Sequence, residues 1–263
     1  MKVTLLGTGG SAGLPQIGGP DGHGDWGDAD PKEPRNARTR SSIVLETAGN
    51  KRLLVDTAPD LRFQLTGCGI GRVDALLYTH SHADHVAGLD DIRILNRIQN
   101  APMPAYGTAE TLAELRSRFG YAFRPHTGGF FARPALVPNI IIPGQCADIL
   151  GESVTFIDQD HGFTRSLGFR VGNFAYCTDV VRMDEATFAV LKDLDVLVAG
   201  CFTLAKEHPS HAGLPTVLAW ANRLQPKRLI LTHMGPDMDY RTLLNTLPTG
   251  VEPGYDGMVI DVV

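Results

Sequence analysis

The sequence predicts an α/β protein in which two mixed β-sheets pack face to face with helices on both outer faces, a four-layer αββα sandwich. Strand-like and helix-like segments alternate along the whole chain. Clusters of strand-like segments occur in both halves, each followed by helices, which is typical of this layering. The 263 residues are enough to bury a large core, so we expect one domain over residues 1–263.

Runs of aliphatic and β-branched residues bounded by turn-forming residues mark the expected strands. In chain order they are Val3–Leu6, Ser42–Glu46, Arg52–Asp56, Ala75–Thr79, Val154–Asp158, Gly168–Val171, Phe174–Thr178, Val196–Ala199, Arg228–Thr232 and Met258–Val262. Apolar residues at helical spacing mark the expected helices. These are Ala58–Leu65, His85–Asn96, Ala109–Phe119, Glu185–Leu191, Pro215–Leu224 and Tyr240–Leu247.

Two segments show neither the alternation of a strand nor the apolar spacing of a helix, and we expect them to be long loops. Residues 15–40 are rich in Gly, Asp and Pro, and residues 121–151 combine aromatic residues with Gly and Pro. Loops of this length in a compact domain are often functional. The aromatic residues of the second segment indicate that this loop is a lid. They could stack a base or sugar, but packing of the lid on the core is the stronger interpretation.

Composition limits the classes of partner. No apolar run approaches the roughly 20 residues that cross a bilayer, and the segment Met1–Gly7 reads as a strand, not a secretion signal. We therefore expect a cytoplasmic protein that does not bind membranes. A formal net charge of −5 opposes binding of duplex nucleic acid. The four cysteines lack paired spacing and are expected to be reduced, buried thiols.

The strongest chemical signal directly follows the expected strand Ala75–Thr79. His80, His82, Asp84 and His85 place four potential metal ligands within six positions. In an extended segment alternate side chains point to the same side, and the turn into a helix brings the later two back toward the first two. An incidental polar turn is a poor alternative, because the chain has only nine histidines. The motif predicts a cation site.

Further ligands are expected at other strand ends, because a fold builds such a site along one rim. His161, Asp179 and His233 each follow a predicted strand. Any one of them alone would more often be a loop or capping residue. Together with the motif they form a nitrogen and oxygen set suited to Zn, Mn or Fe.

These residues resemble the signature of the metallo-β-lactamase superfamily, and the resemblance covers essentially the whole chain. It implies two divalent metal ions, Zn or Mn, in an αββα sandwich. The implied ligands are His80, His82 and His161 for one ion and Asp84, His85 and His233 for the other. Asp179 matches the carboxylate that bridges the ions in hydrolase branches, and Cys177 remains a rival ligand.

A more specific resemblance is to the cyclic phosphodiesterases of phosphonate catabolism, and it implies hydrolysis of a small, cyclic or nucleotide-like phosphodiester. Those relatives often bind a structural zinc through a cysteine cluster after the first strand. This chain has Gly18–Trp26 there, in which only His23, Asp21 and Asp25 offer weak ligands. The resemblance rests on Leu6-Gly7-Thr8-Gly9 with Ser11, Gly13 and Pro15, on Asn36-x-Arg38-x-Arg40-Ser41-Ser42, on His208-Pro209-Ser210-His211 and on Leu231-Thr232-His233-Met234.

Catalytic roles follow from the same resemblance. We expect His211 to donate a proton to the leaving oxygen and Asp84 to accept a hydrogen bond from the attacking water. His208 is an expected substrate contact, although helix capping and an exposed polar position are alternatives for the histidine pair. Arg40, in a basic cluster with Arg35 and Arg38, is the other expected substrate contact, although such a cluster is more often a solvated surface or an internal ion pair. Asp56 is expected either to orient a ligating imidazole or to cap a helix, with equal weight.

Three other functions stay open at this point. A transfer-RNA 3′-end nuclease shares the fold but would need a basic arm, and residues 121–151 contain only two arginines and no lysine. A glyoxalase-type thioester hydrolase could use the same ligands but lacks the segment His208–His211. A non-catalytic metal-bound protein that binds a metabolite would not need a second ion with an acidic bridge. Relatives often form homodimers, and we expect the same here.

Overall fold

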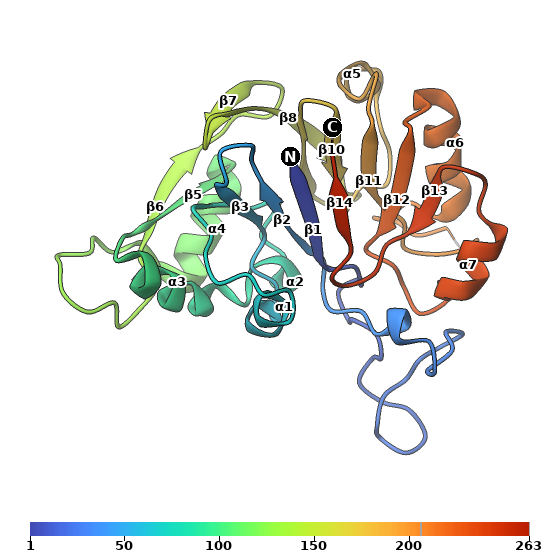
Figure 1. The fold of residues 1–263 in the computed structure, drawn as a ribbon, viewed down its shortest axis with the longest axis horizontal. Helices are drawn as coiled ribbons and strands as arrows, with labels where there is room; N and C mark the ends of the chain where they lie inside the picture. Colours follow the sequence, from blue (N-terminus) through green and yellow to red (C-terminus); the bar gives the residue numbers. More distant parts are fainter. Residues whose placement is uncertain (206, 263) are drawn as a thin grey trace.

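The computed structural model describes residues 1–205 and 207–262 and has the expected sandwich architecture. Two seven-stranded sheets face each other, and helices lie on their outer sides (Figure 1). In spatial order the first sheet contains β14 (Val259–Asp261), β1 (Lys2–Gly7), β2 (Ser42–Glu46), β3 (Arg52–Val55), β4 (Ala75–Leu77), β5 (Met103–Gly107) and β6 (Leu136–Ile140). The second contains β13 (Val251–Pro253), β12 (Arg228–Thr232), β11 (Val196–Gly200), β10 (Phe174–Cys177), β9 (Arg165–Val171), β8 (Glu152–Asp160) and β7 (Cys146–Ile149).

Both sheets combine parallel and antiparallel pairs. Strands β3 to β6 are parallel neighbours, as are β10 to β13, whereas β1, β2, β8 and β9 make antiparallel pairs. The parallel strands of each sheet end at one edge, and the loops that follow them meet there. This edge is where the predicted ligands follow their strands.

The core has three layers of apolar contact. Residues such as Ile43 and Phe169 fill the space between the two sheets. Two further clusters lie between each sheet and its helices, with Leu115 in one and Trp220 in the other. The helices are α1 (Leu61–Gly67), α2 (Ala83–Val86), α3 (Ile92–Gln99), α4 (Ala109–Phe119), α5 (Glu185–Val190), α6 (Leu214–Leu224) and α7 (Tyr240–Thr246), with 3₁₀ turns η1 (Pro34–Asn36), η2 (Leu89–Asp91) and η3 (Gly120–Phe123).

Three expectations were wrong in detail. Residues 121–151 are not one long loop, because β6 and β7 lie within them. The expected helix His85–Asn96 is broken into α2, η2 and α3, since Gly88 packs directly against the backbone of Ala58 and begins a new turn. Strands β5 and β13 were not expected.

Residues 15–40 do lack regular structure apart from η1 and isolated bridges. The expectation of uniformly buried cysteines was also wrong, because Cys146 is exposed and Cys68 is partly exposed, whereas Cys177 and Cys201 are buried. Among the described residues, no helix is long and apolar enough to cross a membrane.

Candidate metal centre

The predicted ligands gather at the edge where the parallel strands end. His80 and His82 follow β4, and Asp84 and His85 lie in the short helix α2. The other three come from the second sheet, after β8, β10 and β12, and they are His161, Asp179 and His233. All seven side chains therefore meet at the junction of the two sheets, although they are spread over more than half of the chain.

In the first ligand group, His80, His82 and His161, hydrogen bonds determine which nitrogens are free. His161 Nδ1 lies 2.8 Å from the carbonyl oxygen of Ser210, which only accepts, so this nitrogen is protonated. His80 Nδ1 lies 3.0 Å from Thr79 Oγ1, whose own hydrogen is donated to a carboxylate. The Nε2 atoms of both rings are thus unprotonated and carry free lone pairs. The distance to His82 Nδ1 is 3.0 Å from His80 Nε2 and 3.3 Å from His161 Nε2.

The second group, Asp84, His85 and His233, contains buried nitrogens without partners. Asp56 accepts hydrogen bonds from His85 Nδ1 at 2.7 Å and from the backbone and hydroxyl of Thr79 at 2.8 and 2.7 Å. In the neutral ring, His85 Nε2 is therefore the nitrogen that carries the free lone pair, and it is directed at the centre. Among the described residues, this atom and both ring nitrogens of His233 are buried with no hydrogen-bond partner. Such atoms are rare, and a cation would satisfy them.

Asp179 lies between the two groups. Its Oδ1 is 3.3 Å from His85 Nε2, and its Oδ2 is 3.3 Å from His233 Nε2. The same Oδ2 is 3.5 Å from His161 Nε2 and 3.8 Å from His80 Nε2. These separations exceed good hydrogen bonds, but bonds of about 2.1 Å to one tetrahedral ion would place its ligands about 3.4 Å apart. The donor set fits a divalent metal.

Electrostatics favour the protonation states that bind a cation. Burial, followed by the nearby His85, holds the pKa of His80 well below its usual value, and burial and His161 lower the pKa of His82. Burial alone would raise the pKa of Asp179, but His233 and His85 hold it well below its usual value. His80 and His82 are thus neutral and Asp179 is ionised, as metal binding requires, whereas Asp179 and Asp56 outweigh burial and hold the pKa of His85 well above its usual value, so binding of a cation would release a proton from that ring.

The backbone is strained where the site is built. Asp56, Asp179 and His233 have positive φ angles of 64°, 49° and 53°, a region that side chains with a Cβ rarely adopt. Each residue follows the end of a strand. Residues held in this region cluster at functional sites because the surrounding packing must enforce them.

Arg38 supports the turn after His233. Its side chain is 2% exposed, and its guanidinium donates to the carbonyl oxygens of Gly235, at 3.3 Å, and Met238, and to Asn36 Oδ1 at 3.1 Å. A fully buried guanidinium needs such partners, because an unpaired charge in the core would be strongly destabilising. The spacing Asn36-x-Arg38 is therefore the signal that could have predicted this supporting role from the sequence.

The glycine-rich turn after β1 also supports the turn that follows His233. Met234 donates its backbone N–H to the carbonyl oxygen of Thr8 at 2.9 Å, and Gly10 donates to the carbonyl oxygen of Met234 at 3.1 Å. A side chain at position 10 would press on the ring of Phe202. Glycine is thus needed where the first strand approaches the turn that follows His233.

His211 lies at the rim of the ligand cluster. Its Nδ1 is 3.9 Å from Asp179 Oδ2, and its ring stacks on that of His233 with centroids 4.8 Å apart. Phe202 and His208 pack against it, each with a centroid distance of 5.0 Å. Burial, followed by His233, lowers the pKa of His211 to about 3, so the ring is neutral near pH 7.

A family profile described as the beta-lactamase superfamily domain matches residues 51–234, which include all seven predicted ligands. The chain belongs to this superfamily. As a beta-lactamase superfamily member with a His and Asp cluster of metal-binding geometry, it is a hydrolase. The two seven-stranded sheets are the metallo-β-lactamase fold.

Three similar proteins have different descriptions. A solved structure described as a new diphosphatase from the PhnP family has a TM-score of 0.88 and 30% identity, covering 100% of this chain and 98% of that one. Ribonuclease Z of Mycobacterium bovis is 26% identical over 97% of this chain and 96% of that protein. A protein of Porphyromonas gingivalis named octanoyltransferase is 30% identical over 98% of this chain, which spans only 51% of that relative.

Several other predicted residues lie outside the cluster. Arg40 pairs with Asp60 at 3.1 Å and is not part of the ligand groups. Cys177 is fully buried and, among the described residues, belongs to no group of metal-binding geometry, which does not support its assignment as a rival ligand. Of the aromatic residues near the second loop, Phe131 is buried whereas Phe130 is 74% exposed. Within the described residues, His23 belongs to no group of metal-binding geometry.

The structure also shows what sequence reasoning missed. Thr79 connects the carboxylate of Asp56 to His80, and the Ser210 carbonyl fixes the tautomer of His161. A threonine hydroxyl and a backbone carbonyl have no sequence signature of their own. The orienting role of Asp56, which the sequence left equal with helix capping, is the one that the structure shows.

Proposed function

We propose that the protein is a dinuclear metal-dependent phosphodiesterase that hydrolyses a small phosphodiester, with two divalent cations, Zn or Mn. The observation that supports this most is the sharing of Asp179 by two sets of lone-pair nitrogens, one around His82 and one around His85. A single-ion site would not need both sets. Two similar proteins are described as a diphosphatase and as ribonuclease Z, names that denote phosphoryl chemistry.

When bound, the two cations would supply Lewis acidity to the phosphoryl oxygens and lower the pKa of water at the site. His80, His82, His161 and Asp179 would hold one, and Asp84, His85, His233 and Asp179 the other. Asp84 has its Oδ2 3.3 Å from His85 Nε2 and is partly exposed, so it is placed to accept a hydrogen bond from the attacking water.

His211 is proposed to serve the leaving oxygen. Its side chain is 15% exposed and lines a cleft of about 390 Å³ together with His208 and Arg182. Because the ring is neutral before substrate binds, it first donates a hydrogen bond to the phosphoryl group. The negative charge of that group then favours uptake of a proton from water by the free ring nitrogen, and the protonated ring passes a proton to the leaving oxygen.

The function is tested by assaying purified protein with Mn²⁺ or Zn²⁺ against bis(p-nitrophenyl) phosphate, a lactam and a thioester. We expect cleavage of the phosphodiester alone. Preferred hydrolysis of the lactam or thioester would refute the proposal and would indicate another branch of the superfamily.

The role of His211 has its own test. His211→Ala should keep the metal content and lose roughly 10²-fold to 10⁴-fold in kcat, the usual range for a general acid. His23→Ala, in an exposed loop remote from the ligand groups, is the matched control and should keep both. Unchanged turnover in His211→Ala would remove this residue from the mechanism.

A further inference from the structure

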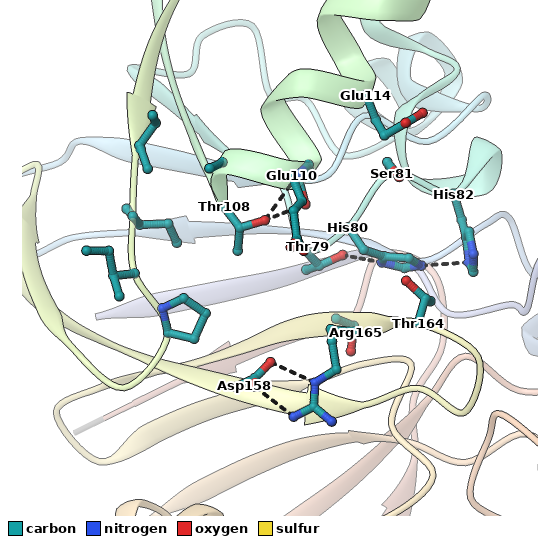
Figure 2. Close-up of a pocket in the computed structure, with 17 residues that line it drawn as sticks. Thr79, His80, Ser81, His82, Thr108, Glu110, Glu114, Asp158, Thr164 and Arg165 are labelled. Atoms are coloured by element: carbon teal, nitrogen blue, oxygen red, sulfur yellow. Dashed lines mark hydrogen bonds and ion pairs between the residues drawn. The ribbon is translucent and has the colours of Figure 1, made fainter.

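A second cleft opens beside the ligand cluster, and the metal chemistry does not account for it. It has a volume of about 490 Å³ and lies between the start of α4, the end of β6 and the turn between β8 and β9. His80 and His82 form part of its wall (Figure 2). A group held there would be in direct contact with the metal centre.

The ring of His161 packs against one wall residue of each cleft. His82 lines the second cleft, and His211 lines the first. The ring of His161 is 5.1 Å from that of His82 and 4.8 Å from that of His211. A phosphodiester has two alcohol groups on one phosphorus. With the leaving group beside His211, the other alcohol group would extend past His82 into the second cleft.

Carboxylates dominate the charge of this second cleft. Its lining contains Glu110, Glu114 and Asp158 but only one cationic side chain, Arg165 (Figure 2). Arg165 is paired with Asp158 at 2.8 Å, and Glu114 is paired at 3.1 Å with Arg118, which does not line the cleft. Within the described part of the chain, Glu110 has no ion-pair partner. An anion entering this cleft would meet an uncompensated negative charge.

The start of α4 does not offset that charge. A helix N-terminus has a partial positive charge of about half an elementary charge. Here Thr108 caps the helix by accepting from the backbone N–H of Thr111 at 3.2 Å, and Glu110 lies in the first turn with a full negative charge. The charge at this wall is therefore negative.

The opposite wall of the cleft is apolar. Ile140 and Ile142 line it although they are 67% and 55% exposed, and Pro143 continues the surface. No phenylalanine, tyrosine or tryptophan among the described residues lines the cleft. Apolar contact with carboxylates opposite suits a small aliphatic group that bears a positive charge, whereas stacking of a nucleobase would need a ring.

We infer that this cleft binds the non-leaving alcohol of the substrate and that its carboxylates, Glu110 foremost, select a cationic amino alcohol over a neutral or anionic one. This inference rests on the proposed phosphodiesterase activity. It names a substrate class, phosphodiesters of amino alcohols such as choline or ethanolamine, and it excludes a second phosphate on that side.

The test compares two chromogenic esters that differ in one charge. One is p-nitrophenyl phosphocholine, and the other is p-nitrophenyl 3,3-dimethylbutyl phosphate, in which carbon replaces the ammonium nitrogen. We expect wild-type kcat/KM to favour the choline ester by about twofold to fivefold, chiefly through KM, as for a solvent-exposed charge pair. Glu110→Gln should bring the ratio close to one, and Glu110→Lys should reverse it.

The matched control is Glu185→Gln on α5, whose carboxylate pairs with Arg223 and lines neither cleft beside the metal centre. It should leave the ratio unchanged. Equal kcat/KM for the two esters in wild type, or an unchanged ratio in both Glu110 variants, would overturn the inference while leaving the phosphodiesterase proposal intact. If no phosphodiester is cleaved at all, including bis(p-nitrophenyl) phosphate, both proposals fail.

Discussion

Replacing Asp56 by asparagine tests how the structure prepares His85 for a metal. Asp56 is 1% exposed and accepts three hydrogen bonds, two from Thr79 and one from His85 Nδ1. Asparagine has the same shape, but its amide nitrogen donates. Facing His85 Nδ1, that amide favours the tautomer protonated on Nε2, the atom that must be free to bind a cation.

The expected cost is a loss of metal affinity that is largest at the site of His85. Removal of an orienting partner usually weakens binding about 10-fold to 100-fold, or about 1.4 to 2.7 kcal/mol. The same Asp56 Oδ2 also accepts from the hydroxyl of Thr79, which contacts His80 Nδ1, so the first site should weaken too, but less, because His161 keeps its hydrogen bond to Ser210. Calorimetric titration of metal-free Asp56→Asn with Zn²⁺ should show one strongly weakened step and one slightly weakened step. Two wild-type steps would refute the tautomer argument.

Three further predictions concern stability. Arg38→Met should lower the free energy of unfolding by roughly 2 to 4 kcal/mol, since three buried acceptors lose their donor, and Arg38→Lys should recover part of this in a urea titration. Gly7→Ala should lower the melting temperature by several degrees, because the added Cβ would clash with the carbonyl oxygen of Arg40, and an unchanged value would contradict the close packing. Hydrogen bonds from Arg35 and Arg241 lower the pKa of Glu33 from 4.5 to about 2, and those from Thr242 and Asp30 lower that of Asp239 to about 2 despite burial. Both shifts stabilise the fold above about pH 4.5, and this contribution is lost as the pH falls toward 2, so thermal unfolding at pH 5 and pH 3 should differ less in Glu33→Gln than in wild type.

The sequence predicted best where one local pattern determines the structure. Helix α4 was expected at its observed bounds, because Thr108 provides a cap and the apolar spacing is regular. The motif His80 to His85 predicted a cation site because its residues are adjacent in the chain. His161, Asp179 and His233 could be proposed because each follows a clear strand, and the structure brings them to the same edge.

The missed elements have weaker local patterns. Strand β5 contains Pro104 and β6 contains Pro138, which interrupt the apolar alternation, and β6 leaves Val137 and Ile140 exposed at the edge of its sheet. The second cleft has walls from both sheets, and the turn after His233 is held by Arg38 from a loop about 200 residues earlier. Such features arise from tertiary packing, so no window of sequence contains them.

The central claim is that two ligand groups share Asp179 and hold two cations. It is tested most directly by elemental analysis of protein loaded with Zn²⁺ and then dialysed, for wild type and Asp179→Asn. We predict close to two equivalents of zinc per wild-type chain and a clear loss in the variant, with circular dichroism showing that the fold is kept. No bound transition metal in wild type, or an unchanged content in Asp179→Asn, would contradict the account.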